Sequence, residues 1–484
     1  MQTNREVIQT AGREALTVSQ ILDAAPTSRF HRRAVIVSGV GFFTDAYDLF
    51  VISTVAVLAA KQWHLTTNQS SWVAGSAILG AFVGAFVFGR AADILGRKRV
   101  YGLVAGLMIV GALASAVAPT FGWLVAARVL LGLGIGGDYP VSAVLMSEFA
   151  NRQDRGKLVG LVFSMQAVGL IVGPVVAMAL LASGLNHDLT WRLLLGFGAI
   201  PAAAVVYLRA KMPESPRFAA QVKGDSDAAL QQLARYSDGV IAQTGASAER
   251  QRNNIGVRQL LTNRRLLGMV VGTAGAWFLF DYAYYGNTLS LPTILADVAP
   301  HASLIAKLAL SLAMFVVFAV PGYLLAIWRM DRFGHRRLQF VGFAVMALAF
   351  LALGVVGPLT HVVPAFLAVF GFSYFFIEFG PNTTTFVLPA EVFPTRVRTT
   401  GHGIAAGVGK LGAFIGVFLV PQLQKSIGLR GMLLVAGGAS AGGFLLTRLI
   451  PEPGGRSLDE IADTVTSTGP PAEEQELVST LAGT

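Results

Sequence analysis

DILGRKR, at residues 93–99, recurs as DRFGHRR at residues 331–337, 238 positions further along the chain. The same shift relates PESPR at residues 213–217 to PEPGGR at residues 451–456. Repeats of this period within one chain predict two structurally related halves, each built from one copy of the repeat.

The composition places both halves in a membrane. The chain has 484 residues, of which 54% are hydrophobic and 13% are charged, and its mean hydropathy is +0.61. A soluble protein of this size needs more charge to cover its surface. Apolar runs recur with about the 20 residues that a helix needs to cross hydrocarbon. The sequence therefore predicts an all-α membrane protein with twelve transmembrane helices in two pseudo-symmetric six-helix bundles: residues 34–60, 71–91, 100–118, 121–144, 157–183, 191–209, 267–295, 304–328, 338–357, 363–389, 401–420 and 429–449.

The polar segments divide the chain around these bundles. We expect a cytoplasmic N-terminal segment (1–33), an N-terminal bundle (34–209), a cytoplasmic central linker with short helices (210–266), a C-terminal bundle (267–449) and a cytoplasmic tail (450–484). About the last 30 residues of this tail are expected to be mobile. If both termini are cytoplasmic, the short inner loops carry thirteen lysines and arginines and the outer loops carry five. This bias agrees with the positive-inside rule. The expected location is the plasma membrane, or the cytoplasmic membrane of a bacterial host, with multiple spans.

Several classes of function lack support in the sequence. The chain has no cysteine, so disulfides, thiolate chemistry and cysteine-ligated metals are excluded. The seven histidines are scattered without metal-ligand spacing, and neither a P-loop nor a nucleophile elbow is present. The net charge of +10 is explained by basic inner loops rather than by nucleic acid. We therefore expect no cofactor, no metal, no nucleic-acid partner and no enzymatic activity.

Two aspartates interrupt the first apolar run. Asp45 and Asp48 lie in GFFTDAYDLFVIS, residues 41–53, and their three-residue spacing puts them on one helix face. A carboxylate at bilayer depth costs about 2.5–3.5 kcal/mol on insertion scales. The alternative is that both lie at a helix end near the surface. Because about ten apolar residues separate Asp45 from Arg33, we favour a position near mid-span.

Other spans carry a matching set of polar residues. Asp138 and Tyr139 follow the glycine-rich GLGIGG in the fourth span. Gln166 lies in the fifth span, where it either binds the substrate or forms a hydrogen bond between helices. The seventh span carries Trp277, Asp281 and Tyr285 at four-residue spacing, so these three side chains share one helix face. The tenth span contains Asn382 beside a Gly-Pro break, and the eleventh contains a lone lysine, Lys410.

This combination of groups suits an oxyanion. A lysine surrounded by amide, phenol and indole donors can bind a tetrahedral anion, whereas ionised aspartates repel it. The conflict disappears if an aspartate is protonated when the anion binds, because a protonated carboxyl donates a hydrogen bond. Anion binding and proton uptake are then coupled. The alternative for Lys410 is a salt bridge to Asp281 made only for packing, although buried ion pairs add little net stability.

The loop GRAADILGRKR, residues 89–99, and the segment RVLLGLGIGG, residues 128–137, resemble signatures of the major facilitator superfamily. The resemblance covers nearly the whole chain and implies a secondary transporter. GFFTDAYDLF, GGDYPVSAVLMSE and GPNTTTFVLPAEVFPTRVR are similar to signature segments of phosphate:proton symporters within that superfamily. The resemblance implies inorganic phosphate and protons as the transported partners, with phosphate held by Tyr139, Gln166, Trp277, Asp281, Tyr285, Asn382 and Lys410, and protons carried by Asp45, Asp48, Asp138 and Asp281.

The superfamily resemblance also implies a cytoplasmic gate made by charged residues of the repeated loops. These are Asp93, Arg97, Glu148, Arg155, Asp331, Arg336, Glu391 and Arg398. The alternative is that the arginines only set the topology. The second repeat departs from the first, because His335 stands where the first has Arg97.

We thus expect a proton-coupled symporter that imports inorganic phosphate by alternating access through a lipid bilayer. The sequence leaves open a symporter of another solute, either an organic acid or a sugar, and a transporter-like receptor that senses phosphate. It does not determine the oligomeric state, and a monomer is compatible with it.

Overall fold

The computed structural model describes residues 17–225, 227–229, 231, 234 and 256–466. Much of the predicted central linker and the last eighteen residues of the predicted tail lie outside the described residues. In the described part of the chain the secondary structure is helical, as predicted, and contains no strand.

The first half contains the following helices: α2 (Val18–Ala24), α3 (Arg29–Phe50), α4 (Ile52–Trp63), α5 (Thr67–Leu95), α6 (Arg97–Ala116), α7 (Phe121–Phe149), α8 (Arg155–Ser164), α9 (Gln166–Ala182), α10 (His187–Phe197), α11 (Ala199–Ala210) and α12 (Pro216–Gln221). The second half contains α14 (Val257–Thr262), α15 (Arg264–Leu289), α16 (Leu291–Val298), α17 (Leu304–Met314), the π-helix η1 (Phe315–Ala319), α18 (Val320–Phe333), α19 (His335–Val355), α20 (Pro358–His361), α21 (Val363–Phe379), α22 (Pro381–Val392), the short 3₁₀-helices η2 (Thr395–Val397) and η3 (Thr447–Leu449), α23 (Arg398–Leu446) and α24 (Leu458–Thr466).

Eleven helical stretches in the described residues are long and apolar enough to cross a membrane. The last stretch, Thr395–Leu449, has 55 residues and turns at Gly428, where φ is 72°. Glycine has no Cβ and adopts this left-handed conformation without strain. The eleventh and twelfth predicted spans are therefore the two arms of one bent stretch, and the prediction of twelve spans is confirmed in this form.

Other predicted boundaries shift by a few residues. The first span begins at Arg29, five residues earlier than expected, and continues through α4 to Trp63. The tenth span is broken into α21 and α22 at Gly380, because Pro381 has no N–H with which to continue the hydrogen-bond ladder. A helix, α24, forms in part of the segment that was predicted to be a mobile tail.

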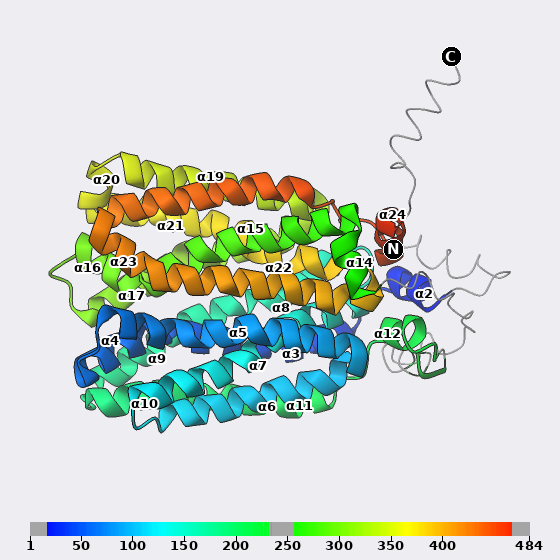
Figure 1. Cartoon of the computed structure of the whole chain (residues 1–484), viewed down its shortest axis with the longest axis horizontal. Coiled ribbons are helices and arrows are strands. Elements are labelled where there is room, and N and C mark those ends of the chain that lie inside the picture. The colour runs from blue at the N-terminus through cyan, green and yellow to red at the C-terminus, as the bar shows by residue number, and fades with distance from the viewer. Residues whose placement is uncertain (1–16, 226, 230, 232–233, 235–255, 467–484) are drawn as a thin grey trace, which may run out of the picture.

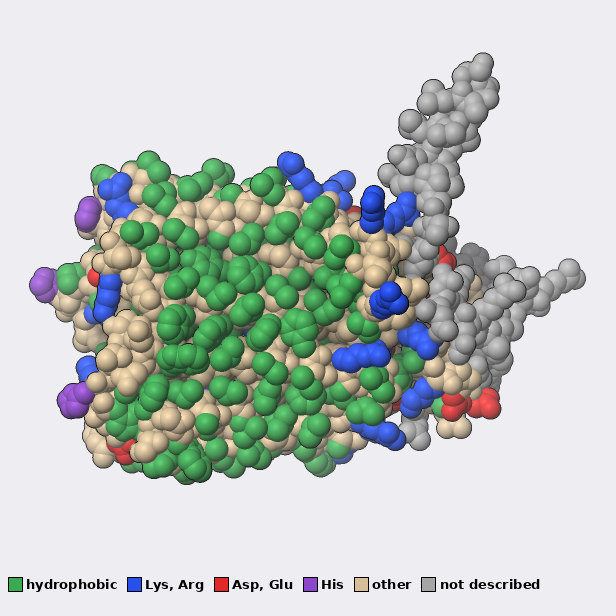
Figure 2. All heavy atoms as spheres, viewed as in Figure 1, with side chains coloured by type: hydrophobic (Ala, Val, Ile, Leu, Met, Phe, Trp, Pro, Cys, Tyr) green, Lys and Arg blue, Asp and Glu red, His purple; other side chains and the backbone are tan. Residues whose placement is uncertain are grey.

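The helices run along the long axis of the molecule, with those of the first half below and those of the second half above in Figure 1. The halves meet where α5 and α7 contact α23, and where α8 contacts α18 and α22. The surface between the two ends is a broad hydrophobic band, and the Lys and Arg side chains gather at the end that carries α12, α14 and α24 (Figure 2). We call this end the basic end; it is the end predicted to face the cytoplasm.

The sequence repeat has a structural counterpart at the basic end. The Glu214 carboxylate accepts hydrogen bonds from the backbone N–H groups of Arg97 (3.1 Å) and Lys98 (3.3 Å) at the start of α6. Glu452 accepts from the N–H groups of His335 and Arg336, both at 3.0 Å, at the start of α19. Each glutamate thus satisfies free donors at a helix N-terminus.

Candidate functional site

The centre of the candidate site is Lys410 on α23. Its ammonium donates to Asp281 Oδ2 at 2.9 Å and to the Tyr285 hydroxyl at 3.2 Å, both from α15. The ammonium also lies 4.3 Å from the Tyr285 ring centroid and 4.5 Å from that of Tyr139 on α7. These residues are all buried. The cation is therefore held between the two halves by a carboxylate, a hydroxyl and two aromatic faces.

Small residues beside Lys410 allow this close packing. A Cβ atom on Gly409 would lie 2.7 Å from ring atoms of Trp277, and one on Gly412 would lie 2.2 Å from the Phe278 carbonyl oxygen. These glycines let α23 approach α15. The Trp277 ring centroid is 6.3 Å from that of Tyr139, so the predicted Trp277–Asp281–Tyr285 stripe faces the other half.

Gln166 connects this cluster to a second group of polar side chains. Its Nε2 donates to the Tyr285 hydroxyl at 3.5 Å, while its Oε1 accepts from the Tyr323 hydroxyl at 2.6 Å and from Asn382 Nδ2 at 3.1 Å. The Tyr139 and Tyr285 hydroxyls are 3.4 Å apart. All seven side chains predicted to hold the substrate therefore lie in one buried cluster formed by α7, α9, α15, α22 and α23.

The sequence analysis missed two members of this cluster. Tyr323 of α18 accepts a hydrogen bond from Asn382 Nδ2 at 2.8 Å, but an uncharged tyrosine in an apolar run gives no sequence signal. Glu378 of α21 accepts another from Asn382, and it is fully buried. A carboxylate within FSYFFIEFG, residues 372–380, is as clear a signal as Asp281 and should have been recognised in the same way.

The predicted proton-carrying aspartates of the first half form two groups. Asp138 accepts from Arg209 Nη2 at 2.6 Å and from Ser142 Oγ at 2.9 Å. Asp48 lies 3.9 Å from Arg128 Nη1, and the same arginine donates to the Asp48 backbone carbonyl at 2.6 Å. Sequence reasoning missed Arg209, because an arginine at the end of a span is ordinary.

Asp45 lies within electrostatic reach of both groups, including Arg209, but forms no ion pair of its own with the described residues. It is fully buried, and neither of its carboxylate oxygens has a hydrogen-bond donor among the described residues. It is within electrostatic reach of both Asp138 and Asp48. The alternative of two aspartates near a helix-end surface is therefore wrong, because the span that holds them continues through α4 to Trp63 and both side chains are buried.

At the basic end an ion pair and hydrogen bonds join the two halves. Arg97 Nη2 contacts Asp93 at 3.2 Å and Glu148 at 3.0 Å, and Arg398 of α23 reaches the same Glu148 oxygen at 3.4 Å. Asp93 also accepts from the backbone N–H (2.7 Å) and hydroxyl (2.6 Å) of Thr400. Residues from α5, α6 and α7 are thus tied to α23.

In a second cluster, a carboxylate of the second half binds backbone groups of the first half. Asp331 of α18 accepts from the backbone N–H groups of Gly156 (3.0 Å) and Lys157 (2.9 Å) at the start of α8. His335 lies 3.3 Å from Asp331 and 3.4 Å from Glu391, so it occupies the place that Arg97 has in the first cluster.

Two predicted gate residues lie at the edge of these clusters. Arg155 pairs with Asp23 of α2 at 2.9 Å and donates to the Arg456 carbonyl at 3.1 Å. Arg336 points elsewhere: its guanidinium packs over the Phe340 ring at 5.5 Å and forms no ion pair with the described residues of either cluster.

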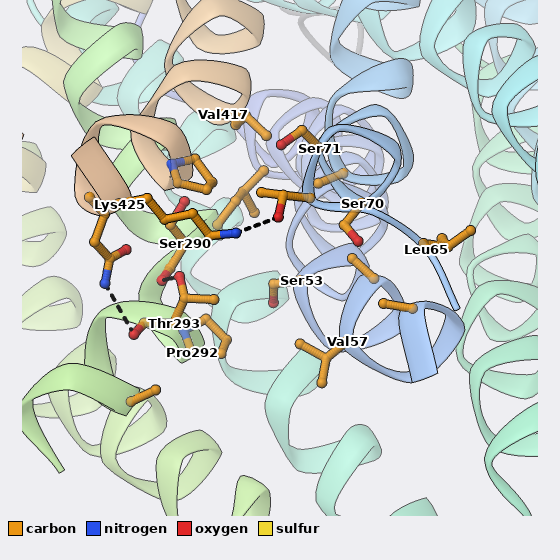
Figure 3. A pocket seen from close by; sticks show the side chains of 18 of the residues that line it. Ser53, Val57, Leu65, Ser70, Ser71, Ser290, Pro292, Thr293, Val417 and Lys425 are labelled. Atoms are coloured by element: carbon orange, nitrogen blue, oxygen red, sulfur yellow. Dashed lines mark hydrogen bonds between the residues drawn. The ribbon is translucent and has the colours of Figure 1, made fainter. Parts of the chain in front are cut away.

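The opposite end contains a cavity of about 680 Å³ between the halves (Figure 3), lined by α4, α5, α16 and the middle of α23. Hydroxyl groups of Ser53, Ser70 and Ser290 line it. Across its mouth Lys425 donates to the Thr67 hydroxyl at 2.6 Å. The structure is therefore hollow at this end and closed at the basic end.

A multi-helix membrane fold with a buried polar cluster between two halves and a closure at one end is typical of a secondary transporter. The model for the family "Sugar (and other) transporter" matches residues 34–464. The chain belongs to this family, within the major facilitator superfamily, and is a multi-pass membrane transporter rather than an enzyme.

Relatives and solved structures support the same classification. The chain is 35% identical to a probable inorganic phosphate transporter 1-6 of Arabidopsis thaliana, over 93% of this chain and 97% of that protein. It is 37% identical to a low affinity inorganic phosphate transporter 4 of Petunia hybrida, over 92% and 94%. The proton:xylose symporter XylE superposes with a TM-score of 0.77 at 20% identity, over 89% of this chain and 98% of that one. The last comparison shows the fold.

Proposed function

We propose that this protein is a proton-coupled symporter that imports inorganic phosphate by alternating access, with both termini in the cytoplasm of the cell whose plasma membrane it spans. The observation that carries the proposal is the buried Lys410–Asp281 pair at 2.9 Å, surrounded by Tyr139, Tyr285 and Gln166. Relatives over 90% of the chain are named inorganic phosphate transporters, which supports phosphate as the substrate.

The chemistry of the cluster suits a phosphate oxyanion. Lys410 supplies one positive charge, and hydroxyl and amide groups of Tyr139, Tyr285, Gln166 and Asn382 supply neutral donors. Charge-assisted hydrogen bonds from such groups to an oxyanion are short and strong. In the structure these donors bond to one another, and we propose that an incoming anion takes over those contacts.

Protonation resolves the conflict between the anion and Asp281. When Asp281 is ionised it neutralises Lys410 and repels an anion; when it is protonated, the lysine is freed for phosphate and the carboxyl itself becomes a donor. Asp45 lies within electrostatic reach of Tyr139, whose hydroxyl is 3.4 Å from that of Tyr285. This chain of groups is our proposed link between the aspartates of the first half and Asp281.

The difference between the two ends of the molecule supports alternating access. The Asp93–Arg97–Glu148–Arg398 cluster closes the basic end, and a cavity lies between the halves at the other end. We propose this cavity as the side from which phosphate enters. We propose that substrate binding favours release of these ion pairs and closure around the cavity mouth, where Lys425 already reaches Thr67.

The test is uptake of radiolabelled phosphate into vesicles reconstituted with the purified protein, under an inward proton gradient. We expect saturable uptake that a protonophore reduces, that excess unlabelled phosphate abolishes and that xylose leaves unchanged. Asp281→Asn and Lys410→Ala should abolish accumulation.

A control variant at a buried position outside the cluster, Ser440→Ala, should transport normally, because among the described residues the Ser440 hydroxyl bonds only to the Ala436 carbonyl of its own helix. Absence of phosphate uptake by folded wild-type protein would overturn the proposal. Uptake of xylose or of an organic acid instead would establish the other symporter that the sequence leaves open. Phosphate binding without uptake would favour a receptor.

A further inference from the structure

Glu378 is a buried carboxyl group that the proposed cycle does not yet use. It is the sixteenth residue of the 30-residue span Val363–Val392 and is fully buried. Asn382 donates to its Oε2, while its Oε1 has no hydrogen-bond donor among the described residues. An ionised carboxylate at this depth without a cation is costly.

The groups that face Glu378 are neutral. Hydroxyls of Tyr284 on α15 and Tyr323 on α18 lie within its reach, and Tyr374 of its own helix is the next titratable neighbour. None of the cationic side chains in the described ranges forms an ion pair with it. Glu378 therefore differs from Asp138, Asp48 and Asp281, each of which faces an arginine or a lysine.

Glu378 competes with two other acceptors for the hydrogens of the Asn382 amide. The Asn382 amide nitrogen has two hydrogens but is in contact with three acceptors, namely Glu378 Oε2, Gln166 Oε1 and the Tyr323 hydroxyl. While Glu378 is ionised, its oxygen is the strongest of these acceptors, because a charged acceptor forms the stronger bond. One N–H of the amide is then held by Glu378 instead of facing the central cluster.

We propose that Glu378 is a further proton-binding site of the transport cycle, one that releases the Asn382 amide for phosphate when it takes up a proton. The proton binds at Oε1, the oxygen without a donor, and forms an O–H bond. The carboxyl then loses its charge, its hold on the Asn382 N–H weakens, and that N–H can turn to a phosphate oxygen. On release the proton leaves Oε1 and the Glu378–Asn382 contact forms again.

This inference rests on the proposed function. It adds one proton to those taken up when phosphate binds. Glu378 is a positioning residue that acts through Asn382. By linkage, each proton taken up with phosphate makes the apparent affinity fall by up to about tenfold for each pH unit above the range in which that proton binds. Replacing Glu378 by an uncharged group of the same shape should remove one such dependence.

The experiment compares wild type, Glu378→Gln and Glu378→Asp in reconstituted vesicles. The readout is the apparent KM for exchange of labelled against unlabelled phosphate, measured across pH 5 to 9 with equal pH on both sides. Glutamine imitates the protonated carboxyl, so Glu378→Gln should still exchange phosphate. At the alkaline end its KM should rise less steeply than that of wild type, by a factor of up to about ten for each pH unit. Aspartate keeps a titratable group and should restore the steeper wild-type profile.

The outcomes separate this inference from the proposed function. If wild-type protein does not exchange phosphate, the proposed function fails. If wild type exchanges phosphate but Glu378→Gln has the same pH profile, Glu378 binds no proton in the cycle. Loss of exchange in a Glu378→Gln protein that remains folded would also contradict the inference, since an amide should replace a protonated carboxyl.

Discussion

Removing the charge of Lys410 gives the sharpest physical test of the central cluster. Lys410→Met keeps the length of the side chain and leaves Asp281 buried without its cation. At 2.9 Å, and with an effective dielectric constant near 20, the attraction between the two charges is about 6 kcal/mol before desolvation is counted. Breaking one partner of a buried pair costs about 3–5 kcal/mol net, because the other charge remains uncompensated.

The double variant separates the pair from its surroundings. Asp281→Asn combined with Lys410→Met removes both charges, and replacement of a buried pair by neutral groups is often neutral or stabilising. We therefore expect Lys410→Met to lower the free energy of unfolding by about 3–5 kcal/mol, and the double variant to recover most of that loss. At lower pH, where the Asp281 carboxyl can accept a proton, the loss in Lys410→Met should shrink.

The assay is chemical unfolding of each purified variant in detergent micelles, followed by tryptophan fluorescence, with phosphate transport measured in parallel. Transport should be absent in the single variants and in the double variant, although the latter is stable. If Lys410→Met is as stable as wild type at neutral pH, or if the double variant is no more stable than Lys410→Met, the reasoning that Asp281 and Lys410 form a mutually compensating buried pair is refuted.

Three further changes test other parts of the molecule. Asp45→Asn should retain phosphate exchange at equal pH but lose gradient-driven accumulation; full accumulation in vesicles would remove it from the proton route. Glu148→Gln weakens the closure of the basic end, so a single reporter cysteine placed there, in a chain that has none of its own, should react faster with a thiol reagent, and an unchanged rate would contradict the gate. Gly41→Ala would place a methyl group 2.0 Å from Arg209 Nη2 and should cost about 1–3 kcal/mol in unfolding free energy. The matched control, Gly106→Ala, meets no atom within 4 Å and should be tolerated; equal effects of the two would show that the Gly41 contact is unimportant.

The sequence located much of the central cluster, and the buried aspartates of the first half, because charge in an apolar run is conspicuous. Asp45, Asp48, Asp281 and Lys410 each interrupt a hydrophobic segment, and four-residue spacing was enough to place Trp277 beside Asp281 on α15. Insertion into hydrocarbon makes such residues costly, so each one has a physical reason to be present. Their roles in transport stay predictions.

Pairings between helices could not be read in the same way. Arg209 ends a span, where a basic residue is expected for topology alone, and only the fold brings it to 2.6 Å from Asp138. Tyr323 carries no charge and became visible only through its contact with Gln166. The helical period tells which residues share a face, but it does not tell which face meets which helix.

For the cytoplasmic gate, the sequence indicated some of the residues but not their contacts. The repeat correctly singled out Asp93, Arg97 and Asp331 as residues in equivalent loops. It did not indicate that Asp331 bonds to backbone N–H groups at the start of α8, or that the side chain of Arg336 turns toward Phe340. Those contacts depend on how the second half is placed against the first.

The most direct test of the account is whether a proton gradient drives phosphate uphill. Wild-type protein and Asp281→Asn are reconstituted into vesicles, and the internal concentration of labelled phosphate is measured under a fixed inward pH difference. We expect wild type to accumulate phosphate until the transported ion is more concentrated inside the vesicles than outside. A protonophore or Asp281→Asn should abolish this excess. Entry that stops at the passive distribution of the ion would contradict proton coupling.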